Sequence, residues 1–161
     1  MHVSAQIAKG LRDVHFGGNW TASSLKGALS NMDWSIATKQ VYGLNTIATL
    51  VFHQNYYIKT LIQVLQGGPL DSHDKYSFDH PPISSKDDWD KFCSSVFDDV
   101  EQLALLIEKL PEEKLEEKFF EEKYGNYYRN LQGVTEHTHY HLGQIVLIRK
   151  ILEQQKSHSK Q

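Results

Sequence analysis

The stretch Glu136-His137-Thr138-His139-Tyr140-His141-Leu142-Gly143-Gln144 lies in a predicted helix that begins near residues 130–133 and runs past residue 151. Apolar residues recur along this helix at helical spacing, and His141 falls on the same stripe. His137 precedes His141 by four residues, so the two imidazoles lie about 40° apart around the helix axis and face the same point. His139 lies about 160° away, on the far side. The run therefore supplies two metal ligands, and a third must come from elsewhere.

Three further long helices follow from the same periodicity. The first ends at Gly17-Gly18, a pair that breaks helices. The second begins with Asn45 as its cap and ends at Gly67-Gly68-Pro69. The third begins with Ser85 as its cap and ends at Pro111.

The connections between these helices differ in length and character. Residues 20–43 are predicted to form an irregular arm with short helical pieces, and the Glu/Lys-rich stretch 112–118 is predicted to be solvated surface. The long connection 69–85 suits a crossover between helices that run in the same direction. The predicted fold is an all-α four-helix bundle with this crossover between its second and third helices. We expect one domain over residues 1–153 and a frayed C-terminal tail over residues 154–161.

Composition narrows the function classes. The chain has 161 residues, 40% of them hydrophobic and 23% charged, with a formal net charge of -3. The scattered basic residues argue against nucleic-acid binding, and no apolar run approaches the roughly 20 residues of a membrane span. The N-terminus lacks the features of a secretory signal, so a cytoplasmic protein is expected. A lone Cys93 provides no disulfide and no thiolate cluster, so any metal must be held by nitrogen and oxygen.

His53 is the candidate for the third ligand because it lies in the middle of the apolar stripe of the second helix. In a bundle, side chains of facing helices can meet in the core and form a metal site. Three imidazoles with an open fourth position are typical of catalytic zinc, and nickel, iron, cobalt or manganese could also occupy such a site. The alternative is that these histidines are hydrogen-bonded core residues that bind no metal.

Two motifs resemble the DinB-like superfamily, which is named for DNA-damage-inducible proteins and includes YfiT-type metal-dependent hydrolases. They are His137-x-x-x-His141-x-Gly143-Gln144-Ile145 and the histidine in Leu50-Val51-Phe52-His53-Gln54-Asn55-Tyr56-Tyr57. The resemblance extends over nearly the whole chain through helix number and the long connection. It implies a four-helix bundle, frequently a homodimer, that binds one divalent metal ion through His53, His137 and His141. Zinc or nickel is expected ahead of iron, cobalt or manganese.

Neighbours of these histidines suggest supporting roles. Gln144, three residues after His141, could orient a histidine or a bound water. Gly143 is expected to let the last helix lie close to a neighbouring element, whether for chemistry or for packing alone. Tyr56 and Tyr57 follow His53 by three and four residues, and core packing is the simpler expectation for both. Glu136 and His139 are expected to face solvent, Cys93 to be an unreactive core residue, and His73 and His80 to lie on the surface.

Two reactions and one non-catalytic role remain open from the sequence. A hydrolase would use the metal to activate water against an ester or amide, and a transferase would use it to hold a low-molecular-weight thiol as the nucleophile. No general base is evident beside the ligands, which favours the transferase or no catalysis. The alternative is a non-catalytic stress-response or DNA-damage-inducible protein in which the metal is structural or absent.

Overall fold

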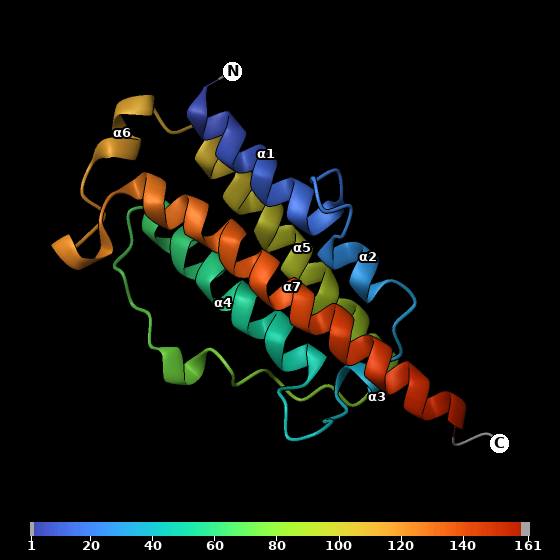
Figure 1. The fold of residues 1–161 in the computed structure, drawn as a ribbon. Coiled ribbons are helices and arrows are strands. Elements are labelled where there is room, and N and C mark those ends of the chain that lie inside the picture. Colours follow the sequence, from blue (N-terminus) through green and yellow to red (C-terminus); the bar gives the residue numbers. More distant parts are fainter. Residues whose placement is uncertain (1, 159–161) are drawn as a thin grey trace.

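The computed structural model describes residues 2–158, which are helical with turns and loops between the helices (Figure 1). These residues form seven α-helices and two short 3₁₀ helices, and within this range the only β pairing is an isolated bridge between Lys118 and Asn126. The all-α class predicted from the sequence is confirmed. No helix in this part of the chain is long and apolar enough to cross a membrane.

Four long helices lie side by side. They are α1 (Val3–Phe16), α4 (Ile47–Leu65), α5 (Lys86–Glu108) and α7 (Tyr127–His158). Helices α1 and α4 each pack against both α5 and α7. Figure 1 shows that α4 and α5 run in the same direction, opposite to α1 and α7. The connection between α4 and α5 therefore travels the length of the molecule, as the predicted crossover requires.

Capping residues set the ends of these helices. The side chain of Ser85 accepts a hydrogen bond from the Asp88 amide and caps α5, as predicted. The predicted cap of α4, Asn45, is wrong: the cap is Thr46, whose hydroxyl accepts from the Thr49 amide at 3.1 Å.

Helix α7 also begins earlier than predicted, at Tyr127 instead of residues 130–133. The side chain of Asn126 accepts from the Arg129 amide at 3.0 Å and satisfies one of the free donors of the first turn. Helix α7 continues to His158, through most of the segment 154–161 that was expected to be a frayed tail. Residues 159–161 lie outside the described range.

Short helices fill the connections. The irregular arm contains α2 (Leu25–Leu29) and α3 (Trp34–Ala37), as predicted for residues 20–43. The crossover contains the 3₁₀ helix η1 (Asp74–Tyr76). Between α5 and α7, α6 (Glu112–Glu116) and the 3₁₀ helix η2 (Glu122–Tyr124) were not predicted, because the stretch is dominated by charged residues. One buried apolar side chain, Leu115, anchors α6 to the core.

The apolar core consists of two clusters that follow one another along the helices. One cluster includes Leu50 and Val51 of α4 together with Leu142 and Ile145 of α7. The other includes Ile58 and Leu61 of α4 together with Leu131 and Val134 of α7. The segments between these residues, 52–57 on α4 and 135–141 on α7, lie at the boundary of the two clusters and carry the candidate site.

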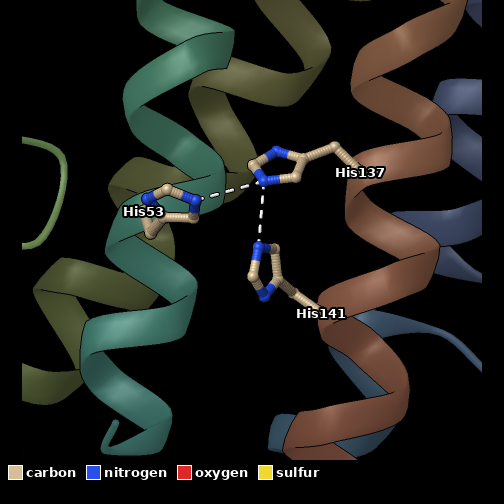
Figure 2. A group of neighbouring side chains, drawn as sticks. All are labelled: His53, His137 and His141. Atoms are coloured by element: carbon tan, nitrogen blue, oxygen red, sulfur yellow. Dashed lines mark hydrogen bonds between the residues drawn. The ribbon is translucent and has the colours of Figure 1, made fainter. Parts of the chain in front are cut away.

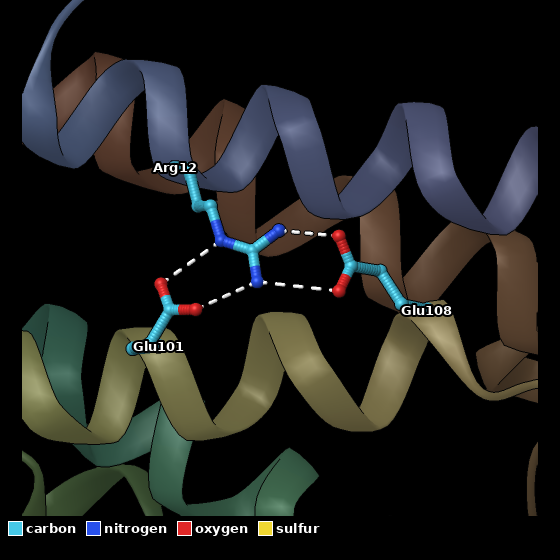
Figure 3. Close-up of polar contacts among 3 residues, drawn as sticks. All are labelled: Arg12, Glu101 and Glu108. Atoms are coloured by element: carbon cyan, nitrogen blue, oxygen red, sulfur yellow. Dashed lines mark hydrogen bonds and ion pairs between the residues drawn. The ribbon is translucent and has the colours of Figure 1, made fainter.

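An ion-pair cluster joins α1 to α5 (Figure 3). Arg12 donates from Nε and Nη2 to the two carboxylate oxygens of Glu101, at 2.9 and 2.7 Å, and its guanidinium also pairs with Glu108. Glu101 and Glu108 are seven residues apart, which is two helical turns, so they lie on the same face of α5. These contacts raise the pKa of Arg12 and lower that of Glu101. The cluster therefore links α1 to one face of α5.

Candidate metal centre

Three histidines converge at the boundary between the two apolar clusters (Figure 2). His53 comes from the middle of α4, and His137 and His141 come from consecutive turns of α7. Nε2 of His137 lies 3.1 Å from Nε2 of His53 and 2.9 Å from Nε2 of His141. One ligand nitrogen from each of the three lies within 4.8 Å of the other two. The geometry that the sequence predicted for these three side chains is present.

Hydrogen bonds on the outer side of two rings place a hydrogen on Nδ1 of each ring. Nδ1 of His53 lies 2.7 Å from Oγ of Ser77, whose hydroxyl donates to the Asp74 carbonyl at 2.7 Å. Because the Ser77 proton is directed to that carbonyl, its oxygen accepts the hydrogen of His53 Nδ1. In its neutral form, His53 therefore keeps a lone pair on Nε2, and the same holds for the neutral form of His141, whose outer contact follows.

His141 is held in the same manner from its own helix. Its Nδ1 donates to Oε1 of Gln144 at 2.8 Å. An outer hydrogen bond of this kind selects the tautomer and the ring orientation of a metal-ligating histidine. The role suggested for Gln144 by the sequence is therefore matched by a contact.

The donor set fits a divalent ion. With lone pairs on Nε2 of both His53 and His141, a hydrogen on Nε2 of His137 can satisfy only one of its two close contacts. A cation between the three nitrogens satisfies all of them. Two imidazole nitrogens at 2.0–2.1 Å from a tetrahedral zinc ion lie about 3.3 Å apart, close to the 3.1 and 2.9 Å that separate Nε2 of His137 from Nε2 of His53 and of His141.

Burial favours the neutral form of His53 and His137, which is the form that binds metal. The pKa of His137 is lowered to about 4, first by burial and then by the neighbouring His141 and His53. The pKa of His53 is also lowered, first by burial and then by His141. Phe78 contributes to this environment by stacking on His53, with ring centroids 4.2 Å apart.

A pocket of about 500 Å³ opens beside the cluster, and His53 and His137 both line it. Tyr57 and Asp74 line it as well, and the Tyr57 hydroxyl donates to Oδ1 of Asp74 at 2.7 Å. Burial and this carboxylate raise the pKa of Tyr57 to about 12, and the Tyr57 hydrogen bond lowers the pKa of Asp74. A carboxylate therefore stands in the pocket next to the histidines, although the sequence had suggested no general base.

Several side chains singled out in the sequence lie elsewhere. Glu136 is exposed, and Nδ1 of His139 bonds with the Thr135 carbonyl on its own helix. His73 pairs with Asp71 on the surface. Cys93 is partly buried, and burial raises the pKa of its thiol to about 12, which agrees with an unreactive residue.

The expectation for Gly143 is wrong. The residue is exposed, and a Cβ built at this position would meet nothing within 4 Å. It therefore mediates no close approach, either for chemistry or for packing. Two positions after His141, residue 143 is directed away from the ligand face of the helix.

The unpredicted residues that contact His53 or Tyr57 belong to the crossover. These residues are Asp74, Ser77 and Phe78, which lie in or beside η1. Ser77 and Phe78 contact His53, and Asp74 lines the pocket. The only signal for them is the Asp-x-x-Ser spacing, which is common in turns and does not indicate proximity to a histidine 24 residues away.

Comparison of the chain with known proteins identified no relative. No family model, no curated protein and no solved structure matches it. The function is therefore inferred from the site itself.

Proposed function

We propose that this protein is a divalent-metal-dependent hydrolase of the DinB-like superfamily that cleaves an ester or amide bond. One observation carries the proposal: two of the three converging histidines, His53 and His137, line a pocket that also contains the carboxylate of Asp74. A structural metal site has four protein ligands and is closed, whereas a catalytic site keeps a position open to solvent or substrate. Only three ligands converge within residues 2–158, and a pocket lies beside them.

Two pocket residues, Asp74 and Tyr57, have different roles in the proposed hydrolysis. When bound, a divalent ion supplies Lewis acidity and brings the pKa of water at the open position toward neutrality. Asp74 accepts the proton that the attacking water loses, because its low pKa keeps it ionised and it lines the same pocket. The Tyr57 hydroxyl holds the Asp74 carboxylate in place through their 2.7 Å hydrogen bond.

The membership in the DinB-like superfamily is supported by the arrangement of the long helices. We assign the fold as a four-helix bundle with a crossover between α4 and α5, the architecture that the resemblance implies. The crossover reaches the site and supplies Ser77 to His53, so it belongs to the functional part of the molecule. The homodimer implied by the same resemblance stays a prediction.

The test compares metal content and turnover in the same samples. Protein purified without a histidine tag is stripped, reloaded with zinc or nickel, and assayed on neutral esters of p-nitrophenol. We expect one ion per chain and metal-dependent hydrolysis. His141→Ala should lose both, while His139→Ala, on the opposite face of the same helix, should retain both.

Other outcomes would replace the proposal. Turnover that appears only after addition of a small thiol would identify a thiol transferase. Stoichiometric metal without turnover of esters or amides, together with a loss of thermal stability on metal removal, would identify a structural site. Full metal content in His53→Ala would remove His53 from the ligand set.

A further inference from the structure

Arg129 differs from the other two arginines of the chain. Arg12 pairs with two glutamates, and Arg149 pairs with Glu153 and donates to the carbonyls of Ala28 and Ser30. The guanidinium of Arg129 makes no hydrogen bond or ion pair with any residue from 2 to 158. Its charge is therefore available to a ligand.

Arg129 lines the pocket of the metal centre. It shares the walls of that 500 Å³ pocket with His53, His137 and Asp74, although it lies in the first turn of α7, eight residues before His137. The only cationic side chain in the pocket wall is thus the one that no carboxylate neutralises.

The start of α7 holds Arg129 in this position. Asn126 caps its amide, and Asn130 donates both amide hydrogens to the carbonyls of Tyr124 and Asn126, at 2.9 and 2.8 Å. Gly125, at a φ of +72°, leaves space for the arginine stem, because a Cβ there would lie 3.0 Å from Cδ of Arg129. The side chain is accommodated by a specific backbone conformation.

A second, apolar pocket of about 300 Å³ adjoins the first and shares Tyr57, Asn130 and Val134 with it. Its remaining walls are mostly apolar and include Leu61, Leu70 and Phe119. A ligand that occupies both pockets meets the histidines and Arg129 at one end and apolar side chains at the other.

We propose that the substrate is a small organic monocarboxylate with an apolar tail, whose carboxylate pairs with Arg129 and whose tail occupies the pocket of Leu61, Leu70 and Phe119. This inference rests on the proposed function, since it names the class of substrate for the same site. The ester or amide bond to be cleaved lies in the first pocket with the carboxylate, where His53 and His137 form the wall together with Arg129.

The charges around the pocket favour a single negative charge. One guanidinium matches one carboxylate in a bidentate pair. Asp74 stands in the same pocket, and Glu116 and Glu122 line the cavity on the other side of Arg129. These carboxylates oppose a dianion such as a phosphate monoester, and the first-turn amides of Tyr127 and Arg129 already have acceptors within the chain.

The test is equilibrium binding of matched probes to the zinc-loaded protein, measured by isothermal titration calorimetry. The probes are 4-phenylbutyrate and the uncharged 4-phenylbutanamide. We expect the carboxylate to bind at least tenfold more tightly than the amide. Arg129→Gln should lower the affinity for 4-phenylbutyrate by about 10- to 100-fold, as expected for loss of a charge-assisted pair. The affinity for 4-phenylbutanamide should be unchanged. Leu70→Ala should weaken both probes.

The control is Lys118→Gln, which makes the same change in net charge in the cavity on the other side of Arg129. It should leave both affinities unchanged. Equal binding of the two probes, equal affinity in Arg129→Gln, or an equal loss in Lys118→Gln would overturn the inference. The measurement needs no turnover. Arg129-dependent binding without hydrolysis would reject only the proposed hydrolase function. Hydrolysis of neutral esters without Arg129-dependent binding would reject only the proposal that the substrate carries a carboxylate.

Discussion

Oε1 of Gln144 accepts the hydrogen on Nδ1 of His141 at 2.8 Å, so residues one helical turn apart on α7 determine which nitrogen of His141 faces His137. Replacing Gln144 by leucine removes the acceptor and frees the ring to rotate or to change tautomer. We expect Gln144→Leu to lower zinc affinity by about 10- to 100-fold, the usual effect of losing an outer partner of a ligand.

Competition against a chromophoric chelator measures that affinity. Gln132→Leu is the matched control, because Gln132 lies on the same helix five residues before His137 and should retain wild-type affinity. Unchanged affinity in Gln144→Leu would show that the hydrogen bond has no influence on the ligand.

Ser77 supplies the corresponding contact to His53 from the crossover. Ser77→Ala leaves Nδ1 of His53 without its buried acceptor. We expect zinc affinity to fall by about tenfold or more in the same competition assay. Ser94→Ala, an exposed serine on α5, should bind zinc as the wild type does. If Ser77→Ala binds zinc normally, the crossover has no part in the metal centre.

His15 gives a pH dependence of stability that is separate from the metal centre. It is fully buried on α1, its Nδ1 bonds with the Leu11 carbonyl, and its Nε2 has no hydrogen-bond partner among residues 2–158. Burial lowers its pKa from 6.5 to about 4, and His139 adds to this effect. The unfolded chain therefore binds the proton more readily than the folded protein between these two values, so stability decreases as the pH falls from 6.5 toward 4.

Between pH 8 and pH 5, His15 should account for a loss of about 2 kcal/mol in the free energy of unfolding. The free energy of unfolding is measured by urea titration of zinc-loaded protein at pH 8 and at pH 5. Between these pH values it should decrease by about 2 kcal/mol less in His15→Leu than in the wild type. Comparing the two losses, each taken relative to pH 8, removes any constant effect of the substitution. Equal losses would contradict the assignment.

Arg12 connects α1 with α5 through the partly exposed carboxylates of Glu101 and Glu108. Its contribution to the free energy of unfolding should therefore be modest. We expect Arg12→Met to lower the free energy of unfolding by about 1 kcal/mol at low salt and by less at 1 M salt, where such pairs are screened. Arg129→Met is the control, because its guanidinium has no carboxylate partner among the described residues. A loss in Arg12→Met that does not depend on salt would assign the effect to packing of the side-chain stem.

The four long helices could be predicted because their apolar residues keep a helical period over many turns. Exact ends were harder, because Asn45 and Thr46 are adjacent residues that both can cap, and only the backbone decides between them. Helix α6 has a single buried apolar residue, Leu115, which is too little for a periodic signal. The start of α7 is polar, so only Asn126 marks it.

The three histidines could be predicted because each belongs to a helix whose geometry is regular. The same geometry excluded His139, and it would also have excluded Gly143, which lies two residues after His141 as His139 lies two residues before it. Ser77 and Asp74 could not be predicted, because the path of a 17-residue connection is set by its contacts with α4 and not by a local period.

The position of the histidines between two apolar clusters has a consequence for motions of the folded chain. His53 and His137 are 84 positions apart, and each lies where one cluster ends and the other begins. Without a bound ion, the two halves of the core can open separately and their backbone amides can exchange hydrogen at different rates. With an ion bound to all three rings, opening of either half disturbs the site that both halves share, so slow exchange should extend across both clusters as one cooperative unit.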